Sequence, residues 1–465
     1  MKAIFILSDS FRRDHVGAYG NSWIHTPNLD ALAARSTVFD SAYAGSFPTG
    51  PNRRDMALGR GHAPGCAFNP WRNFGPDDVT MAARLSDAGV HTMMITDVAN
   101  GATHERNMFR GFQRYLVNRG QEADGYWSDA NVPLEFPVPH ELIRYRAEAY
   151  HRVRLVQSQR RYEEDYFAPG TFRLACQWLE RNRKRDDFLL WVETFDPHEP
   201  WDPPQWYVDR YDPGYAGRVL DCPPYGFYRR LGITPREMRH VQARYAAECT
   251  MVDAAVGRLL ATLDRLGLTD EVAIVFTSDH GIYADYEGDA GCVCKPWVVN
   301  EDGRFMAAGS SELRNPTWLP LRTGTVRLPL IVKRPGRTRG RRVRAVAQPW
   351  DIHPTMLELF GAPVPDGLQG RSLLPLTEGG KLPPRPHAFN GRLFGGPPEL
   401  AQAMNSRWIY SYFSGDRQRP SLLDLREDPS QTRNVAREHP QVCRRMHAAL
   451  ARFSPAQFEG VANPW

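Results

Sequence analysis

The run Ala3-Ile4-Phe5-Ile6-Leu7 stands directly after Met1-Lys2, and Ser8-Asp9-Ser10 follows at once. A continuous apolar run of this length with polar residues at its end is typical of a strand buried on both faces of a parallel sheet. Open α/β sheets bind their ligands beyond the carboxyl ends of such strands. We therefore interpret the run as the first strand of a sheet and Asp9 as the first candidate functional residue.

Similar apolar runs alternate with helical patterns along most of the chain. This alternation predicts an α/β fold, a large and mostly parallel sheet flanked by helices on both faces. We expect strands at residues 38–44, 91–95, 188–192, 272–276 and 328–332. We expect helices at residues 27–33, 79–88, 172–182 and 237–266.

The pattern changes near residue 385, after which short strands are expected at 408–413 and 421–424 and a closing helix at 442–453. This predicts a catalytic domain at residues 1–384 and a small α+β subdomain at residues 385–465. Two segments of the larger domain break the alternation. Residues 199–236 are rich in Pro, Tyr and Trp and are expected to form a long ordered loop over a site, and residues 296–322 an insertion or lid.

Composition indicates the general class of protein but not the reaction it catalyses. The 465 residues are 42% hydrophobic and 24% charged, with a net charge of +5, which is ordinary for a globular enzyme. The Arg residues are scattered, so no nucleic-acid partner is expected. No run approaches the roughly 20 apolar residues of a membrane span, so no membrane partner is expected either.

Cysteine usage and the N-terminus favour a cytoplasmic protein. The first apolar run is too short for a signal peptide and leads straight into Asp9. The seven cysteines are irregularly spaced, which fits free thiols in a reducing compartment. Cys292 and Cys294 are interpreted as packed thiols and not as a metal pair. Homo-oligomer formation stays open.

Polar side chains follow four of the expected strands. They are Asp9, Thr49, the pair Asp196 and His198, and the pair Asp279 and His280. Because the carboxyl ends of parallel strands meet at one edge of a sheet, these groups are expected to lie together. Two carboxylates and a neutral imidazole suit Mg²⁺, Mn²⁺, Ca²⁺ or Zn²⁺. A hydroxyl held by such an ion gains acidity and can attack at neutral pH.

The run Thr49-Gly50-Pro51-Asn52-Arg53 stands ten residues before Gly59-Arg60 and carries the clearest resemblance. It resembles the nucleophile-x-Pro-x-Arg segment of the alkaline phosphatase superfamily, on its sulfatase and phosphonate monoester hydrolase branch. The similarity covers almost the whole chain. Further matching segments are residues 6–14, 26–30, 196–200, 278–281, 288–295, 351–355, 366–374 and 423–434.

This resemblance implies roles for individual residues. One divalent ion, with Mn²⁺, Ca²⁺, Mg²⁺ and Zn²⁺ all open, would lie between Asp9, Thr49, Asp279 and His280. Arg53 would hold the nucleophile and its developing charge. His198 and Lys295 would contact the anionic oxygens of a small-molecule ester substrate, and one of them would protonate the leaving group. Asp14 is expected to stabilise the first turn and not to bind metal.

The chain also departs from the family pattern. Ser10 stands where a second acidic ligand is usual, Ala290 replaces a histidine, and residues 96–100 lack the usual Lys-x-His segment. The two-metal branch has an Asp-x-x-x-His pair for its second ion. Asp196 and His198 are only two residues apart, so a single metal is expected.

Threonine at position 49 decides the expected chemistry. Sulfatases convert cysteine or serine to formylglycine, whose hydrate expels sulfate without attack of water on sulfur, and threonine has no such route. A Thr49 ester must be hydrolysed by water at the central atom, which suits a phosphoryl group clamped by metal, Arg and Lys. The main interpretation is therefore hydrolysis of a phosphate ester, preferably a phosphodiester or phosphonate monoester, through a covalent Thr49 intermediate.

Three other readings of the same residues stay open. The chain could be a sulfatase with residual or promiscuous activity. It could be a non-hydrolytic binder of an anionic ligand, which the alanine at position 290 favours and the two retained metal motifs oppose. It could also be a phosphoryl transferase that passes the group on Thr49 to an alcohol.

Overall fold

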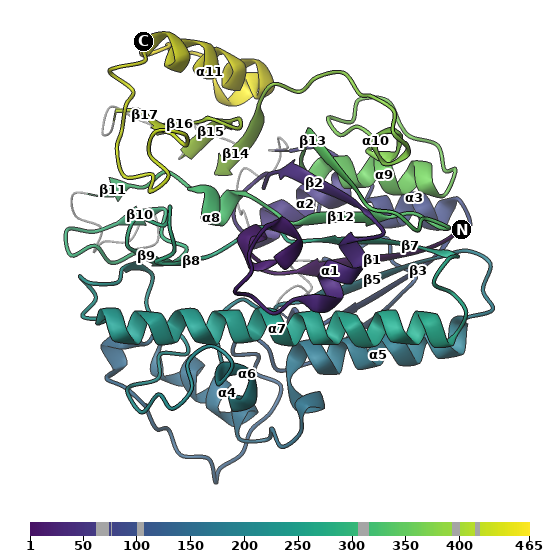
Figure 1. The fold of residues 1–465 in the computed structure, drawn as a ribbon, viewed down its shortest axis with the longest axis horizontal. Helices are drawn as coiled ribbons and strands as arrows, with labels where there is room; N and C mark the ends of the chain where they lie inside the picture. The colour runs from purple at the N-terminus through teal and green to yellow at the C-terminus, as the bar shows by residue number, and fades with distance from the viewer. Residues whose placement is uncertain (62–73, 76, 100–106, 306–315, 393–399, 414–418) are drawn as a thin grey trace.

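The computed structural model describes residues 1–61, 74–75, 77–99, 107–305, 316–392, 400–413 and 419–465. Its centre is an eight-stranded sheet in the order β13-β2-β12-β7-β1-β5-β3-β4 (Figure 1). The strands span Lys2–Ser8 (β1), Thr37–Ala42 (β2), His91–Thr96 (β3), Arg114–Val117 (β4), Phe188–Thr194 (β5), Val272–Thr277 (β7), Leu330–Lys333 (β12) and Arg341–Ala347 (β13). The predicted large, mostly parallel sheet is confirmed.

One strand runs against the others. β12 pairs antiparallel with both of its neighbours, β2 and β7, whereas β1 is parallel to β5 and β7. The strand expected at residues 328–332 is therefore present two residues later, but in the opposite direction. An apolar run predicts a buried strand without predicting which way it runs.

Side chains of β1 alternate between two hydrophobic cores, one on each face of the sheet. Ile4 and Ile6 pack with α1, α4, α5 and α7, while Phe5 and Leu7 pack with α2, α3, α9 and α10. Fully burying such a side chain contributes roughly 1.5–3 kcal/mol. Figure 1 shows α5 and α7 side by side along one face of the sheet. The helices span Pro27–Ala33 (α1), Thr49–Leu58 (α2), Met81–Asp87 (α3), Ala147–Gln157 (α4), Phe167–Asn182 (α5), Pro235–Arg265 (α7), Ile352–Leu359 (α9) and Leu374–Glu378 (α10).

The last part of the chain forms a separate antiparallel sheet covered by one helix, as expected for an α+β subdomain (Figure 1). Its backbone contacts the segment between β2 and α2, just before Thr49, because the Phe47 amide donates to the Gly391 carbonyl at 2.9 Å. The division between residues 384 and 385 stays a prediction. The elements are Ala388–Arg392 (β14), Leu400–Met404 (β15), Trp408–Phe413 (β16), Ser421–Asp424 (β17) and Pro440–Phe453 (α11).

The two irregular segments carry short elements. Residues 199–236 contain α6 (Gln205–Val208) and β6 (Gly226–Phe227), and β6 joins β8 (Tyr283–Ala284) and β9 (Cys292–Cys294) in a small sheet. Residues 306–315 of the expected lid lie outside the described residues, and beside them β10 (Val298–Val299) pairs with β11 (Thr317–Trp318) before α8 (Thr323–Val326). None of the described helices is long and apolar enough to cross a membrane.

A buried ion pair fixes the segment after β1 to the segment that leads to Lys295. Nη1 of Arg12 donates to both carboxylate oxygens of Asp289 at 2.9 and 2.8 Å, and neither side chain is more than 1% exposed. Asp289 also accepts from the backbone amides of Ala284 and Tyr286. This pair therefore holds two of the segments that carry site residues in register.

We expect Asp289→Ala to destabilise the fold by about 3–5 kcal/mol, because the change leaves the Arg12 guanidinium buried without this carboxylate. Urea denaturation measures the loss. The matched control is Glu438→Ala, which breaks an ion pair on the surface: the side chain of Glu438 is 51% exposed and that of its partner Arg433 is 65% exposed. This change should lower the free energy of unfolding by less than about 1 kcal/mol. Equal effects of the two changes would contradict the structural role given to Asp289.

Candidate active site

The end of β1 presents Asp9 and Ser10 to the interior of the site. Both are fully buried, and Ser10 adopts a left-handed backbone conformation with φ of 61°. Its amide donates to Oδ1 of Asp279 at 3.1 Å, and its hydroxyl donates to Oδ1 of Asp9 at 2.7 Å. Ser10, in the place of a second acidic ligand, thus orients the two carboxylates that remain.

The tautomer of His280 follows from its hydrogen bonds. Nδ1 lies 3.0 Å from the carbonyl oxygen of Gly281, and because a carbonyl only accepts, Nδ1 carries the proton. Nε2 is then left with a free lone pair and lies 3.1 Å from Oγ1 of Thr49. Burial lowers the pKa of His280 to about 4, so the imidazole is neutral near pH 7.

Asp9, Asp279 and His280 form a group that fits a divalent cation. One ligand atom from each lies within 4.8 Å of the others, and all three side chains are buried. Burial and the charge of Asp279 raise the pKa of Asp9 to about 8. Burial acts on Asp279 in the same way, but His280 and Arg53 outweigh it and lower the pKa of Asp279. Two buried carboxylates beside a neutral imidazole are the donor set expected of a metal site.

Thr49 is the first residue of α2, and its side chain, which carries the hydroxyl, is partly exposed. Its position at the N-terminus of a ten-residue helix places it where the helix dipole favours negative charge. Ser46, three residues earlier, is buried, and its hydroxyl donates to Asp55 at 3.0 Å. The structure therefore brings Thr49 and not Ser46 to the carboxylates and His280.

Arg53 lies one turn along α2 and contacts three carboxylates, one with each of its guanidinium nitrogens. Nη2 donates to Asp9 at 3.0 Å, Nη1 donates to Asp279 at 2.6 Å, and Nε donates to Glu193. Burial alone would lower the pKa of Arg53, but the three carboxylates raise it above its ordinary value, with Glu193 the largest contributor. The guanidinium is therefore charged and fixed in one plane.

Glu193 is a residue that the sequence analysis missed. It is the sixth residue of β5 and is fully buried, and its second oxygen accepts from Nε1 of Trp191 at 3.2 Å. Burial raises the pKa of Glu193, and Arg53 opposes this. A charged residue inside the otherwise apolar strand Phe188–Thr194 was the signal available in the sequence.

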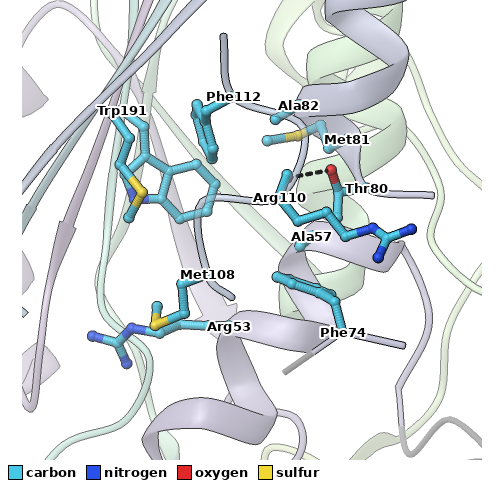
Figure 2. A pocket seen from close by; sticks show the side chains of 11 residues that line it. Arg53, Ala57, Phe74, Thr80, Met81, Ala82, Met108, Arg110, Phe112 and Trp191 are labelled. Carbon is cyan, nitrogen blue, oxygen red and sulfur yellow. Dashed lines mark hydrogen bonds between the residues drawn. The ribbon is translucent and has the colours of Figure 1, made fainter. Parts of the chain in front are cut away.

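An apolar pocket lies behind Arg53 (Figure 2). Figure 2 shows Trp191 and Phe112 facing into it, while the guanidinium of Arg53 points away from its middle. It leaves a cavity of about 20 Å³, lined by Arg53, Ala57, Phe74, Thr80, Met81, Ala82, Met94, Met108, Arg110, Phe112 and Trp191. None of the candidate metal ligands lines this pocket, so its effect is to pack the aliphatic stem of Arg53.

His198 and Lys295 come from two further segments, the first after β5 and the second directly after β9. Nδ1 of His198 donates to the carbonyl oxygen of Glu199 at 2.7 Å, and the ring stacks on Phe195 with centroids 3.9 Å apart. Burial and the nearby charge of Lys295 lower the pKa of His198 well below its usual range. Lys295 is 4% exposed and has no hydrogen bond or ion pair to another described residue. Its ammonium group is thus available to an anion.

Other candidate ligands are engaged elsewhere. The carboxylate of Asp196 accepts from Nε2 of Gln121 at 2.8 Å and from the amide of Ala168 at 3.0 Å. Asp14 forms a two-point contact with Arg12, at 2.8 and 2.6 Å, and so stabilises the first turn as expected.

Cys292 and Cys294 are buried free thiols, as interpreted from the sequence. Among the described residues, one group of three metal-ligating side chains is found, that of Asp9, Asp279 and His280.

Sequence comparisons identify the family of this site. A sequence model described as sulfatase matches residues 2–362, and one described as N-sulphoglucosamine sulphohydrolase, C-terminal, matches residues 321–455. An arylsulfatase of Clostridium perfringens is 24% identical, over 93% of this chain and 89% of that protein. An N-acetylglucosamine-6-O-sulfatase of Bacteroides thetaiotaomicron is 24% identical, over 82% of this chain and 71% of that protein.

Solved structures share the fold. A phosphonate monoester hydrolase of Agrobacterium radiobacter superposes with a TM-score of 0.71 at 19% identity, over 98% of this chain and 96% of that one. A protein in complex with its substrate D-glucosamine-2-N,6-O-disulfate gives a TM-score of 0.69 at 19% identity, over 100% of this chain and 99% of that one. The sulfatase model spans well over half of the sequence. The chain therefore belongs to the sulfatase family within the alkaline phosphatase superfamily, and it is an enzyme that hydrolyses sulfuric or phosphoric esters.

Proposed function

We propose that this enzyme hydrolyses a monoanionic ester, with Thr49 as an unmodified hydroxyl nucleophile and one divalent ion held by Asp9, Asp279, His280 and Thr49. The observation that carries the proposal is the position of the Thr49 hydroxyl. It lies 3.1 Å from Nε2 of His280, a member of the group that fits a cation. A partly exposed hydroxyl at that point is the nucleophile that the site requires.

The charges around the nucleophile favour a substrate with a single negative charge. Three carboxylates, those of Asp9, Asp279 and Glu193, surround the guanidinium of Arg53. Binding of a cation requires Asp9 and Asp279 to be ionised, and with Lys295 nearby and both histidines neutral these side chains then sum to one net negative charge. A divalent ion turns this into one net positive charge, which matches a sulfate monoester, a phosphodiester or a phosphonate monoester. A phosphate monoester, which carries two negative charges at neutral pH, matches less well.

A sulfate ester is the first candidate among these substrates. The two family models and the named relatives, an arylsulfatase and an N-acetylglucosamine-6-O-sulfatase, support it. This reverses the preference of the sequence analysis, in which a phosphate ester was the main interpretation and a sulfatase the alternative. Family membership is stronger support than the identity of one residue.

A phosphodiester or phosphonate monoester is the second candidate, because Thr49 itself favours it. Threonine cannot become formylglycine, so a covalent intermediate must be released by water at the central atom. Phosphorus in a site clamped by Arg53 and Lys295 allows such an attack. The fold is shared with a phosphonate monoester hydrolase, which adds support without deciding the substrate.

The residues of the chain divide the chemical work. When bound, a divalent ion lowers the pKa of a coordinated hydroxyl and withdraws charge from the ester oxygens. Arg53 and Lys295 stabilise the negative charge that develops on those oxygens. His198 has its proton on Nδ1, tied to Glu199, and is neutral, so it accepts a hydrogen bond and does not donate one from Nε2. Lys295 is therefore the proton source for the leaving group.

Asp279→Asn should remove most of the metal and nearly all turnover, because Asp279 is a ligand and also orders Ser10 and Arg53. Elemental analysis of the purified variant measures the first effect and an ester assay the second. Asp196→Asn is the matched control, since its carboxylate is bound to Gln121 and Ala168, and it should keep its metal. Full metal occupancy in Asp279→Asn would refute the ligand assignment.

Arg53→Ala should lower kcat by about two orders of magnitude or more, the size of effect seen when one donor to a developing oxyanion is lost. Steady-state kinetics at saturating metal test this. Arg54→Ala, one residue along the helix, removes a guanidinium that pairs with Asp78 and should change kcat only severalfold. If kcat/KM of Arg53→Ala equals that of the wild type, Arg53 has no part in the reaction.

The nucleophile and the substrate are tested together with matched aryl esters of sulfate, phosphodiester and phosphonate. Peptide mass spectrometry should show an unmodified Thr49, and Thr49→Ala should abolish turnover of whichever ester is the substrate, while Thr49→Ser retains part of it. A preference for one class of about a hundredfold in kcat/KM, roughly 2.7 kcal/mol, assigns the substrate.

The same assay separates the remaining alternatives. Sulfate hydrolysis that depends on Thr49 supports the first candidate, and preferred hydrolysis of the phosphorus esters supports the second. Transfer to an added alcohol would show a transferase, and binding of anions without turnover would show a binder. Efficient hydrolysis that survives Thr49→Ala would overturn the proposed nucleophile.

A further inference from the structure

We infer that Glu193 sets the charge of the active site and, through Arg53, selects esters with one negative charge over esters with two. The inference rests on the proposed function for the location of the substrate. It gives Glu193 the role of a positioning and specificity-determining residue, since its contacts are to Arg53 and Trp191 and not to the metal ligands.

The place of Glu193 in the sheet puts its charge beside the site. In the register of β5, Glu193 lies opposite Leu7 of β1 on one side and Thr96 of β3 on the other. It is fully buried, one residue before the end of the strand that leads to His198. A carboxylate at this depth is shielded from solvent, so its charge is screened less than a charge on the surface would be.

The hydrogen bonds of Glu193 fit its ionised form. Oε1 accepts from Nε of Arg53, and Oε2 accepts from Nε1 of Trp191 at 3.2 Å. Both partners are obligate donors, because neither a guanidinium nor an indole N–H can accept. A proton on Glu193 would face one of these donors, so the pair of contacts favours the carboxylate.

Glu193 and Trp191 together fix Arg53. Trp191 lines the apolar pocket that holds the stem of Arg53 (Figure 2), and it donates to the carboxylate that holds Nε. Nη1 and Nη2 are left to meet Asp279 and Asp9. Of the three carboxylates that the described residues place on Arg53, that of Glu193 alone is absent from the metal-ligating group, so its charge is additional to the charge of the two candidate ligands.

Removal of the charge on Glu193 should change the preference of the site between anions with one and with two negative charges. Without Glu193, the side chains and a divalent ion would sum to two net positive charges, which suits a dianion. With Glu193, the sum is one net positive charge, which suits a monoanion. A residue with a merely structural role would weaken the binding of both kinds of anion alike and would leave their ratio unchanged.

Four proteins, which differ in the charge or in the length of the side chain at position 193, test the role of Glu193. They are the wild type and the variants Glu193→Gln, Glu193→Asp and Glu193→Asn, each loaded with metal, with the metal content confirmed by elemental analysis. Isothermal calorimetry measures the Kd of methyl sulfate, a monoanion, and of inorganic sulfate, a dianion of similar shape. Thermal unfolding confirms that each variant is folded.

The neutral variants Glu193→Gln and Glu193→Asn should shift the ratio of the two Kd values toward inorganic sulfate by about tenfold or more. Glu193→Asp should keep the wild-type ratio within about threefold, even if kcat falls because Arg53 moves. If Glu193→Gln does not fold, the comparison of Glu193→Asp with Glu193→Asn decides the question alone.

An unchanged ratio in the neutral variants, or an equal shift in Glu193→Asp, would overturn the role of Glu193. The measurement does not need turnover. If the wild type binds both anions but hydrolyses no ester, the proposed hydrolysis fails, while the ratio still decides whether Glu193 selects charge.

Discussion

The guanidinium of Arg53 is the contact on which the rest of the site depends. It links the ends of three neighbouring strands, because Asp9 follows β1, Asp279 follows β7 and Glu193 lies near the end of β5. Three buried carboxylates would repel one another without a cation among them, and breaking such a group costs several kcal/mol. Arg53 reaches them from α2, so the helix that carries Thr49 is held against the sheet by the same contact that orders the candidate metal ligands. One side chain thereby positions both the proposed nucleophile and the candidate cation site.

Much of this site could be predicted from the sequence, because the ends of buried strands are local features. Asp9, Asp279 and His280 each lie within four residues of the end of an apolar run, and in a parallel sheet such positions meet at one edge. Thr49 and Arg53 stand four residues apart, so their common direction follows from helix geometry. Asp196 also follows a strand, but its carboxylate bonds to Gln121 and Ala168, and nothing near Asp196 in the sequence distinguishes the two cases.

What the sequence did not predict depends on pairing between distant segments. Glu193 lies inside an apolar strand, and its role appears only when Arg53, 140 residues earlier, is placed beside it. The pairing of Arg12 with Asp289 spans 277 residues in the same way. The direction of β12 is set by which strands it joins, and an apolar run carries no sign of direction. The family resemblance predicted which segments of the chain carry site residues. The net charge of the site depends on contacts between distant residues, which appear only in the structure.

The replacement of an acidic residue by Ser10 gains meaning from this charge balance. A fourth carboxylate beside Asp9, Asp279 and Glu193 would leave the site with Arg53, Lys295 and a divalent ion electrically neutral, and an anionic ester would then find no net attraction. The amide of Ser10 donates to Asp279 and its hydroxyl donates to Asp9, and the side chain adds no charge. Glu193 supplies negative charge one step farther from the nucleophile, where it acts on Arg53 and not on the cation. With Ser10 uncharged, the negative charge of Glu193 leaves the proposed site, with its divalent ion, the single positive charge that matches the proposed monoanionic ester.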